Sequence, residues 1–407
     1  MGDKSAFVAI MDRVKLMNIT GKALSGEWGN EDTTGEGTCV LRTANFTNEG
    51  VFNYDEVVTR KIPSKKGLEN KYLRRGDIVI EKSGGSDKWP VGRVIYFNEE
   101  ENKYLFNNFT GLLRVQDRKK WNPKYVFYSL YFNYLVGGTR QYENKTTGLH
   151  NLKTDLYVEN FKVKSISKAE QDDIVTKIDK IRHIIDAKNK QILMFDELIK
   201  ARFVEMFGGN DKKVAISSLC DVLGGYSFKS EDISSKGFIK ILQIGNVYLD
   251  DVNWETTNYL PKEFDNMYSR FLLNEGDIVI ALTRPIIQSL GNVKACIVKA
   301  SDTPCLLNQR VGRIVSKKNV DVNLKFIYGC LMTDDFTRYV ESCCIGCSQP
   351  NISTKDIENY MIPDASYEKQ MDFVRLKEQV DKSKFEIQKS LEKTQQLYDS
   401  LMQKYFG

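Results

Sequence analysis

The sequence predicts a mixed α+β fold in which two compact α/β domains alternate with two long helices. Two stretches, 168–208 and 367–407, carry apolar residues at spacings of three and four, the pattern of a long amphipathic helix. Short β-rich runs bounded by Gly, Asn, Asp and Ser precede each stretch. The whole order recurs after about 200 positions, which is too long for a solenoid and indicates duplication of a domain with its helix.

Composition places the chain among ordinary globular proteins. Its 407 residues allow two to three domains, and 41% hydrophobic and 28% charged residues exclude a disordered chain. No apolar run reaches membrane-spanning length and the N-terminal segment lacks a signal-peptide core, so no membrane association and a cytoplasmic location are expected. Eight cysteines without a disulfide-like spacing agree with this. A net charge of +5 requires any nucleic-acid surface to be a local patch.

The chain begins with a predicted short helix, and the first domain follows. Residues 1–15 are expected to be helical and amphipathic, and the first domain is expected over 16–167. Within it, the aromatic stretch 121–136 is predicted to be a helix because its apolar positions do not alternate. A Gly-Gly-Thr-Arg turn and a polar loop are expected to connect this helix to Lys153.

The first long helix, 168–208, has a heptad seam and ends at the pair Gly208-Gly209. A helix of this size spans roughly 60 Å at about 1.5 Å per residue, which favours a spacer or a coiled-coil arm. Its seam residues are Ile174, Ile178, Ile181, Ile185, Ile192, Phe195 and Ile199.

The second domain, 209–366, repeats the order of the first. LRRGDIVI at 73–80 corresponds to LNEGDIVI at 273–280. The segments on either side of these strands also correspond between the two domains at about the same offset. Asn246 corresponds to Asn45, and both are expected to form turns.

The second long helix, 367–407, superposes on the first in period and in its Phe-Gly end. Its seam residues are Phe373, Val380, Ile387, Leu391 and Leu401. Because the chain must return across a compact domain between them, we expect the two helices to pack as an antiparallel pair. The seams carry polar breaks at Lys188, Arg202, Lys377, Lys384 and Thr394. Two similar heads on paired helices form a pseudo-twofold arrangement, which by analogy with dimeric DNA readers suits two different half-sites.

Several motifs in this order resemble the specificity subunits of type I restriction–modification systems. They are the duplicated domain–helix order, GDIVI in both copies, Ile-Gly-Asn at 244–246, Leu-Asn-Gln-Arg-Val-Gly-Arg-Ile at 307–314, Pro-Asn-Ile at 350–352, and helices ending in Glu-Met-Phe-Gly and Lys-Tyr-Phe-Gly. The resemblance covers essentially the whole chain. The first domain departs from it, because Arg42-Thr43-Ala44-Asn45 replaces an Ile-Gly-Asn-like run and Asn108-Phe109-Thr110 replaces Asn-Gln-Arg.

The resemblance implies a DNA-reading subunit without catalytic residues. The two globular parts would be target-recognition domains, each reading one half of a bipartite, asymmetric target in double-stranded DNA. The helices would space them and dock two methyltransferase subunits, with restriction and translocase subunits joining outside. No cofactor is expected in this chain, since S-adenosylmethionine, ATP and Mg would belong to those partners.

Catalytic and metal-binding patterns are absent or incomplete in the sequence. The string beginning at Asn122-Pro123 lacks the second proline of a base-flipping methyltransferase clamp and is expected to start the aromatic helix. No P-loop occurs. Of the two histidines, His183 is expected on a helix surface and His150 in a loop with a structural role. The cluster Cys343, Cys344 and Cys347 lacks a fourth zinc ligand, so free thiols are expected.

Side chains suited to reading DNA lie in predicted loops of both domains. Arg and Lys pair with guanine, Asn and Gln with adenine, and basic residues also contact phosphates. The candidates are Lys65, Lys66, Ser83, Ser86, Lys88, Trp89, Asn108, Arg140 and Gln141 in the first domain, and Thr283, Arg284, Gln288, Gln309, Arg310, Ser348 and Gln349 in the second. The alternative for each residue is a solvated loop or a turn hydrogen bond.

Two other functions stay open at the level of sequence. One is a coiled-coil adaptor with two protein-binding heads, which a salt-dependent DNA-binding assay would separate from a DNA reader. The other is the specificity part of a fused or split restriction–methyltransferase. Neither the target bases nor binding without the methyltransferase subunits follows from the sequence.

Overall fold

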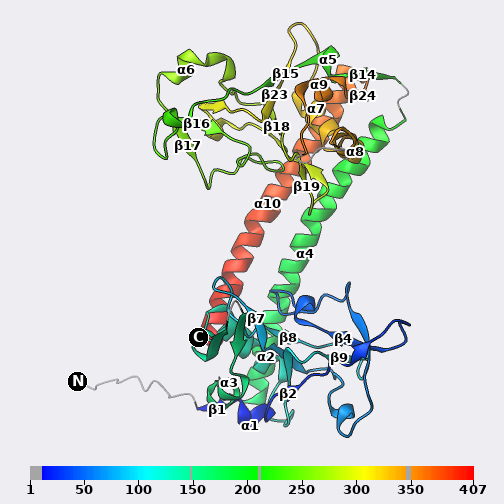
Figure 1. Cartoon of the computed structure of the whole chain (residues 1–407), viewed down its shortest axis with the longest axis vertical. Coiled ribbons are helices and arrows are strands. Elements are labelled where there is room, and N and C mark those ends of the chain that lie inside the picture. The colour runs from blue at the N-terminus through cyan, green and yellow to red at the C-terminus, as the bar shows by residue number, and fades with distance from the viewer. Residues whose placement is uncertain (1–11, 147–148, 210–211, 345–349) are drawn as a thin grey trace, which may run out of the picture. The chain divides into compact units, whose positions relative to one another are not determined.

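The computed structural model describes residues 12–146, 149–209, 212–344 and 350–407, and its contacts divide the chain into two units (Figure 1). The first unit comprises Met1–Lys188 with Ser390–Gly407, and the second comprises Asn189–Lys389. Each unit therefore contains one predicted domain, part of the first long helix and part of the second. The long helices are shared between the units and are not separate bodies.

The described residues of the first unit form small sheets and three short helices besides the parts of the two long helices. Its strands are β1 (Arg13–Lys15), β2 (Leu24–Ser25), β3 (Asn30–Glu31), β4 (Thr38–Leu41), β5 (Val58–Lys61), β6 (Ile78–Glu81), β7 (Ser83–Gly85), β8 (Val94–Tyr96), β9 (Tyr104–Phe106), β10 (Thr110–Leu113), β11 (Glu143–Thr146), β12 (Leu149–Leu152) and β13 (Lys162–Lys164). Its short helices are α1 (Met17–Thr20), α2 (Pro123–Leu135) and α3 (Thr154–Asn160). The strand orders are β2-β10-β6-β8, β3-β5-β4-β9, β11-β12-β7 and β1-β13.

The second unit follows the same plan. Its strands are β14 (Lys213–Ala215), β15 (Cys220–Gly224), β16 (Ile239–Leu242), β17 (Asn258–Leu260), β18 (Ile278–Ala281), β19 (Ile286–Ile287), β20 (Asn292–Val293), β21 (Ala295–Ile297), β22 (Cys305–Leu307), β23 (Val311–Ser316) and β24 (Met361–Pro363). Its short helices are α5 (Ile216–Leu219), α6 (Phe264–Met267), α7 (Leu324–Leu331), α8 (Asp334–Cys343) and α9 (Thr354–Asn359). The order β15-β23-β18-β21 repeats β2-β10-β6-β8, and the parallel pair β16–β22 repeats β4–β9.

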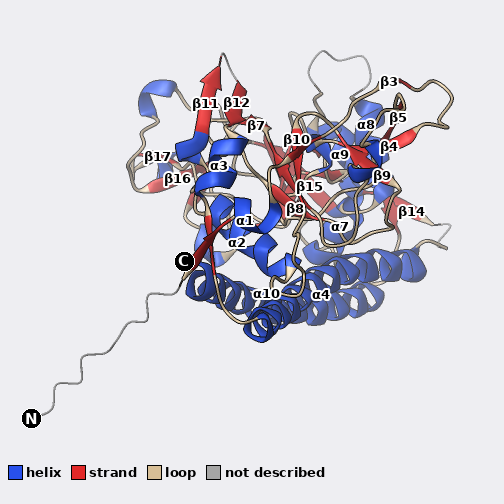
Figure 2. Ribbon diagram, turned by 90° about the horizontal axis from the view of Figure 1, so that it is seen from below, coloured by secondary structure: helices blue, strands red, loops and turns tan. Residues whose placement is uncertain are grey.

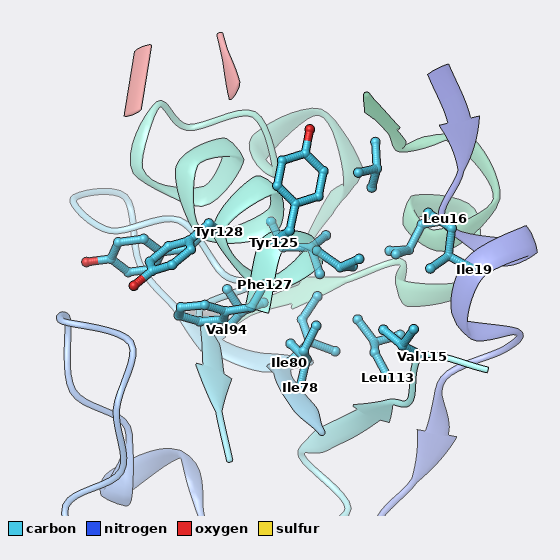
Figure 3. Packing of buried hydrophobic residues seen from close by; sticks show 14 of the residues in the cluster. Leu16, Ile19, Ile78, Ile80, Val94, Leu113, Val115, Tyr125, Phe127 and Tyr128 are labelled. Carbon is cyan, nitrogen blue, oxygen red and sulfur yellow. The ribbon is translucent and has the colours of Figure 1, made fainter. Parts of the chain in front are cut away.

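The duplicated GDIVI segment forms the central strand of each unit, as the sequence predicts. Ile78 and Ile80 of β6 pack in one cluster with α2, while Val79 packs in another with Phe106 and its neighbours. Figure 3 shows Ile78 and Ile80 near the aromatic side chains of α2. Successive strand residues point to opposite faces, so a strand buried on both sides reads as an unbroken apolar run.

The aromatic stretch after residue 120 is helix α2, which confirms that prediction. Asn122 caps the helix, because its side chain accepts hydrogen bonds from the backbone N–H groups of Lys124 and Tyr125. Pro123 occupies the first turn, where its missing N–H costs nothing. The Asn-Pro string is thus a helix start. Asn323 caps α7 in the same way.

The two long helices are α4 (Lys168–Phe207) and α10 (Tyr367–Phe406), each continuous over its length (Figures 1 and 2). Within each unit their contacts run in opposite directions along the chain. In the first unit Lys188 donates hydrogen bonds to Ser390 and Thr394, and in the second unit Lys384 pairs with Asp196. The predicted antiparallel packing is confirmed, and these polar breaks in the seams have partners on the facing helix.

The predicted seam residues are buried or half-buried, most deeply beside the domains. Ile178 and Phe373 are fully buried, whereas Ile185 and Ile192 are half-buried. The Phe-Gly ends of both helices also have matched roles. Phe406 packs on Tyr125 of α2 in the first unit, and Phe207 packs on Phe326 of α7 in the second.

Two segments differ from the sequence-based expectation. Arg13–Lys15 was expected at the end of a helix but forms strand β1, because it pairs with β13 from the far end of the domain; the rest of that predicted helix, up to residue 11, lies outside the described residues. The polar loop expected before Lys153 contains the hairpin β11–β12, which extends the sheet of β7. The strands that pair with these segments, β13 for β1 and β7 for the hairpin, are distant in the sequence. Periodicity alone does not reveal such pairing.

Candidate nucleic-acid interface

Three loop segments of the first unit meet at the carboxyl end of β6. Lys82 donates its backbone N–H to Phe109 at 2.8 Å, and its carbonyl accepts from the N–H of Leu152 at 2.9 Å. These bonds join residues 82–91, the turn 107–110 and the hairpin β11–β12 into what we call the first loop cluster. Most of the predicted DNA-contacting residues of the first domain lie in it or beside it.

The second unit has an equivalent second loop cluster at the carboxyl end of β18. Leu282 donates to the carbonyl of Arg310 and accepts from the N–H of Ile352, each at 2.8 Å. This cluster joins residues 282–293, the turn 308–311 and the segment from residue 350. The bridge between Thr283 and Asn351 repeats the pairing of Ser83 with Asn151. The two clusters have one backbone plan and different side chains.

The turn 86–89 presents the most exposed aromatic side chain of the first loop cluster. Ser86 closes the turn, since its hydroxyl accepts from the N–H of Trp89 at 3.1 Å and its own N–H donates to the Trp89 carbonyl at 2.7 Å. Trp89 is 55% exposed, and the Lys88 ammonium lies 5.6 Å from its ring centroid. An exposed indole beside a cation suits stacking or phosphate contact. Ser86 holds the turn, which is the alternative that the sequence left open.

Arg140 and Gln141 are partly used in local structure. The Arg140 guanidinium donates to the carbonyls of Asp87 and Lys88, each at 3.2 Å. The Gln141 amide donates to the Gly138 carbonyl at 3.1 Å. Arg140 thus supports the Trp89 turn. Both residues remain exposed at the edge of the first loop cluster.

The turn before β10 exposes Asn108 and Phe109 and buries Asn107. Phe109 is 52% exposed, a feature that sequence reasoning missed because apolar character predicts burial. Asn107 is 4% exposed, and its counterpart Asn308 is 8% exposed. Among the described residues, the side-chain oxygen of each finds no hydrogen-bond partner. Asn107 and Asn308 are thus equivalent buried positions in the turns of the two units.

Lys65 and Lys66 lie outside the first loop cluster, after β5, and differ in their surroundings. Lys65 pairs with Glu27 at 2.7 Å, and Lys71 pairs with the same carboxylate. Partial burial opposes ionisation of Glu27, but the hydrogen bonds from Lys65 and Lys71 outweigh it and hold the pKa of this carboxyl below its ordinary value. The charge of Lys65 is thus partly compensated. Lys66 is exposed.

In the second loop cluster the turn residues are held by the backbone and their side chains stay exposed. Arg284 and Arg310 have positive φ angles of 47° and 67°, which non-glycine residues adopt at some energetic cost. Both are exposed, as are Gln309 and, in the turn after β19, Gln288. Thr283 is buried at 8% exposure and contributes mainly through its backbone pairing. The predicted residues Ser348 and Gln349 lie outside the described residues.

The predicted turn residues Asn45 and Asn246 do not belong to either loop cluster. The Asn45 side chain accepts from the N–H of Arg42 and donates to the carbonyl of Asn53, and Asn246 makes the equivalent pair of bonds. Both close turns as expected.

His183 lies on the exposed surface of α4. His150 differs from expectation, because it lies in strand β12 and is 6% exposed.

The described residues contain no group of three or more His, Cys, Asp or Glu side chains that could hold a metal ion. Cys343 is a free thiol at the end of α8, Cys344 follows it and is half-buried, and Cys347 lies outside the described part of the chain. Within that same part, no helix is long and apolar enough to cross a membrane.

Comparison with known proteins identifies related sequences. A family model described as "Type I restriction modification DNA specificity domain" matches residues 210–397. The chain is 29% identical to the type I restriction enzyme MjaVIII specificity subunit of Methanocaldococcus jannaschii, over 69% of this chain and 70% of that protein. It is 34% identical to the type I restriction enzyme EcoAI specificity subunit of Escherichia coli, over 36% of this chain and 24% of that protein.

Solved structures share the fold. The S subunit of a type I restriction–modification system from M. genitalium has a TM-score of 0.57 at 15% identity, covering 100% of this chain and 99% of that chain. A structure described as "Structural basis underlying complex assembly and conformational transition of the type I R-M system" has a TM-score of 0.55 at 15% identity, covering 97% of both chains. The structures support the fold, and the family-model match and the two relatives show that the chain is similar to the specificity subunits of type I restriction–modification systems.

Proposed function

We propose that this chain reads a bipartite, asymmetric target in double-stranded DNA, one half with each loop cluster. The observation that carries the proposal is the duplication itself. The same end of equivalent strands, β6 and β18, holds loops of one backbone plan with different polar side chains. Two readers of this kind suit two different half-sites. The similarity to type I restriction–modification specificity subunits supports DNA target recognition, and such subunits are non-catalytic.

Exposed arginine, lysine, asparagine and glutamine side chains supply the chemistry for base and phosphate contacts. Arg284, Gln309 and Arg310 are the candidates for base edges in the second loop cluster, because they are exposed on turns. In the first loop cluster Lys88, Trp89 and Asn108 have this role. Phosphate contacts by neighbouring lysines would fix the register without carrying sequence information.

Replacement of one domain tests this division. Residues 209–366 would be exchanged for the corresponding domain of another specificity subunit, and methylated sites would be mapped by single-molecule sequencing in cells carrying the complete system. We expect one half of the methylated sequence to change and the other half to stay the same. A change in both halves, or in neither, would exclude the two-reader division.

We also propose that α4 and α10 space the two domains and that the outer face of the helices docks methyltransferase subunits. In this proposal the methyltransferase subunits carry S-adenosylmethionine. The restriction and translocase subunits join through the complex. The support is an exposed apolar face on the second-unit part of α4. Leu193, Met194 and Leu198 are 65%, 57% and 41% exposed, and Val204 is 63% exposed. These residues share one side of the helix at about 100° per residue. Exposed apolar faces of this kind mark protein-interaction sites.

Charge substitutions on the outer face and in the seam separate docking from helix pairing. Met194→Glu is expected to weaken co-purification with the methyltransferase subunits while the thermal transition of the chain alone is unchanged. Ile192→Asp in the seam is expected to lower that transition as well. Assembly of the Met194→Glu chain with wild-type stoichiometry and affinity would contradict docking at this face. The seam prediction fails separately if Ile192→Asp leaves both stability and assembly unchanged.

A further inference from the structure

The Trp89 turn is held by the neighbouring hairpin through a small group of polar side chains. The Arg140 guanidinium donates to the carbonyls of Asp87 and Lys88, each at 3.2 Å. The Glu143 carboxylate accepts the N–H of Val91 at 3.0 Å. The Glu143 side chain is 4% exposed. A buried carboxylate needs partners for both oxygens, because an unsatisfied charge is costly to bury.

His150 supplies the second partner of Glu143 and also reaches the turn. Its Nδ1 lies 3.0 Å from the second Glu143 oxygen, and its Nε2 lies 3.5 Å from a carboxylate oxygen of Asp87. The imidazole side chain is 7% exposed, whereas the Asp87 side chain is 87% exposed. His150 is therefore placed between a buried carboxylate of the hairpin and an exposed carboxylate on the turn that carries Trp89.

We propose that His150 is a positioning residue for DNA reading by the first loop cluster: it fixes the turn 86–89, and with it Lys88 and Trp89, by bridging Asp87 to Glu143. This inference rests on the proposed function and deepens it. The imidazole does not touch the DNA in this proposal. It acts through the turn that presents the exposed indole and ammonium groups.

The bridge depends on the protonation state of the imidazole. A doubly protonated ring donates from both nitrogens and can satisfy Glu143 and Asp87 together, whereas a neutral ring carries one N–H. Among the described side chains, the neighbouring charged groups are these two carboxylates, the guanidinium of Arg140 and the Lys88 ammonium on the turn. The two carboxylates contact the two ring nitrogens, at 3.0 Å for Glu143 and 3.5 Å for Asp87. Because the complete bridge needs both ring protons, we expect it to hold the turn more firmly at lower pH.

The second loop cluster lacks this device. Pro350 occupies the position that corresponds to His150, and it contributes only its carbonyl, which accepts the N–H of Arg284 at 2.8 Å. Proline has no titratable group. The inference therefore predicts a pH effect on one half of the target and none on the other, which a general effect of pH on DNA binding would not produce.

The test measures discrimination at each half-site separately. The full chain, assembled with the methyltransferase subunits of its system, would be titrated with DNA duplexes carrying the sequence obtained from methylation mapping. Matched duplexes would carry one mismatch in the first or the second half-site. Binding would be measured from about pH 6 to about pH 8, the range in which histidines titrate. We expect discrimination at the first half-site to rise several-fold as the pH falls, with no change at the second.

Three variants and one control complete the experiment. Asp87→Asn is expected to flatten the pH profile of the first half-site without affecting folding, because Asp87 is exposed. His150→Gln and Glu143→Gln are expected to reduce discrimination there up to about tenfold at low pH, with melting temperatures checked for each. His183→Gln, the other histidine in the sequence, is expected to behave as wild type in every measurement.

The outcomes distinguish this inference from the proposed function. Absence of sequence-specific binding by the wild-type complex would overturn the proposed function and this inference with it. Normal discrimination at both half-sites, with the same pH profile in wild type and Asp87→Asn, would overturn the role of His150 alone. Equal effects of the variants on both half-sites would also overturn it, because the bridge exists in one unit.

Discussion

The Asp77 carboxylate accepts two hydrogen bonds from the Arg114 guanidinium, at 2.8 and 2.6 Å, and is fully buried at the start of the GDIVI strand. Its counterpart Asp277 pairs with Arg313 at 2.8 Å. Among the described residues, the Nε of Arg313 finds no partner, so the second pair has one donor fewer. The duplicated aspartate thus anchors two neighbouring strands to each other in each unit.

Loss of either aspartate should destabilise its own unit. We expect Asp77→Ala to lower the free energy of unfolding of the first unit by about 3–5 kcal/mol, because it leaves the Arg114 cation without its carboxylate. Asp277→Ala should lower the free energy of unfolding of the second unit by about 1 kcal/mol less than Asp77→Ala lowers that of the first, because one hydrogen bond fewer is lost. Hydrogen exchange across urea concentrations would measure β10 and β23 separately. Asp173→Asn, in an exposed pair with Lys177, should change stability by less than about 0.5 kcal/mol. Equal losses for the two aspartates would contradict the geometric difference.

A buried glutamine at the start of each long helix ties that helix to its domain. The Gln171 oxygen accepts the N–H of Asn122 at 2.8 Å, and Gln370 accepts that of Asn323 at 3.0 Å. Each replacement by alanine should cost about 1–3 kcal/mol, because a buried backbone N–H loses its partner. Thermal unfolding of the two single variants and the double variant would measure this. The losses should add, since the sites share no partner; a neutral Gln171→Ala would mean that the bond contributes nothing.

Salt dependence should distinguish Lys66 from Lys65. If Lys66 contacts a phosphate, Lys66→Gln should reduce the slope of log affinity against log salt by about 0.9. Lys65→Gln should reduce it less, because Glu27 already compensates the Lys65 charge. DNA binding by the assembled complex at several salt concentrations provides the slopes. Identical slopes for wild type and both variants would remove these lysines from the interface, and a wild-type slope near zero would favour the protein-binding adaptor.

Thiol reactivity should follow burial. Burial raises the pKa of the Cys220, Cys296 and Cys305 thiols to about 12. At pH 8 the reactive thiolate is then about one part in ten thousand, so maleimide labelling of these thiols should be very slow in the folded protein and rise about tenfold per pH unit. Half-buried Cys39 and Cys343 should label before these three. Peptide mass spectrometry would compare native and urea-unfolded samples. Rapid native labelling of Cys296 would contradict its burial.

The architecture could be predicted from the sequence because the chain is duplicated. A weak pattern for a strand or a helix in one half could be compared with its counterpart in the other half. The GDIVI strands, the helix capped by Asn122 and the antiparallel long helices were all predicted and are confirmed. The first strand was not predicted, because Arg13–Lys15 becomes extended only through pairing with β13 far along the chain. Local periodicity carries no information about such a partner.

Within the candidate interface, the sequence predicted the loops better than the roles of their side chains. Ser86 and Thr283 were candidates for DNA contact, but Ser86 closes a turn and Thr283 is buried. His150 was expected in a loop and lies in a strand between two carboxylates. Its partner Asp87 comes from a distant turn, and only the folded chain brings such groups together. Base contact by the remaining exposed residues stays a prediction.

The packing of Phe406, Met402 and Tyr398 into the first unit has a consequence for synthesis on the ribosome. Domains generally fold in the order in which they are translated. Here the first unit lacks part of its interior until the segment Ser390–Gly407 has been made, after the whole of the second unit. The first unit is therefore completed only after the second, and a premature stop that removes this segment would damage the first unit although the codons for Met1–Lys188 are intact.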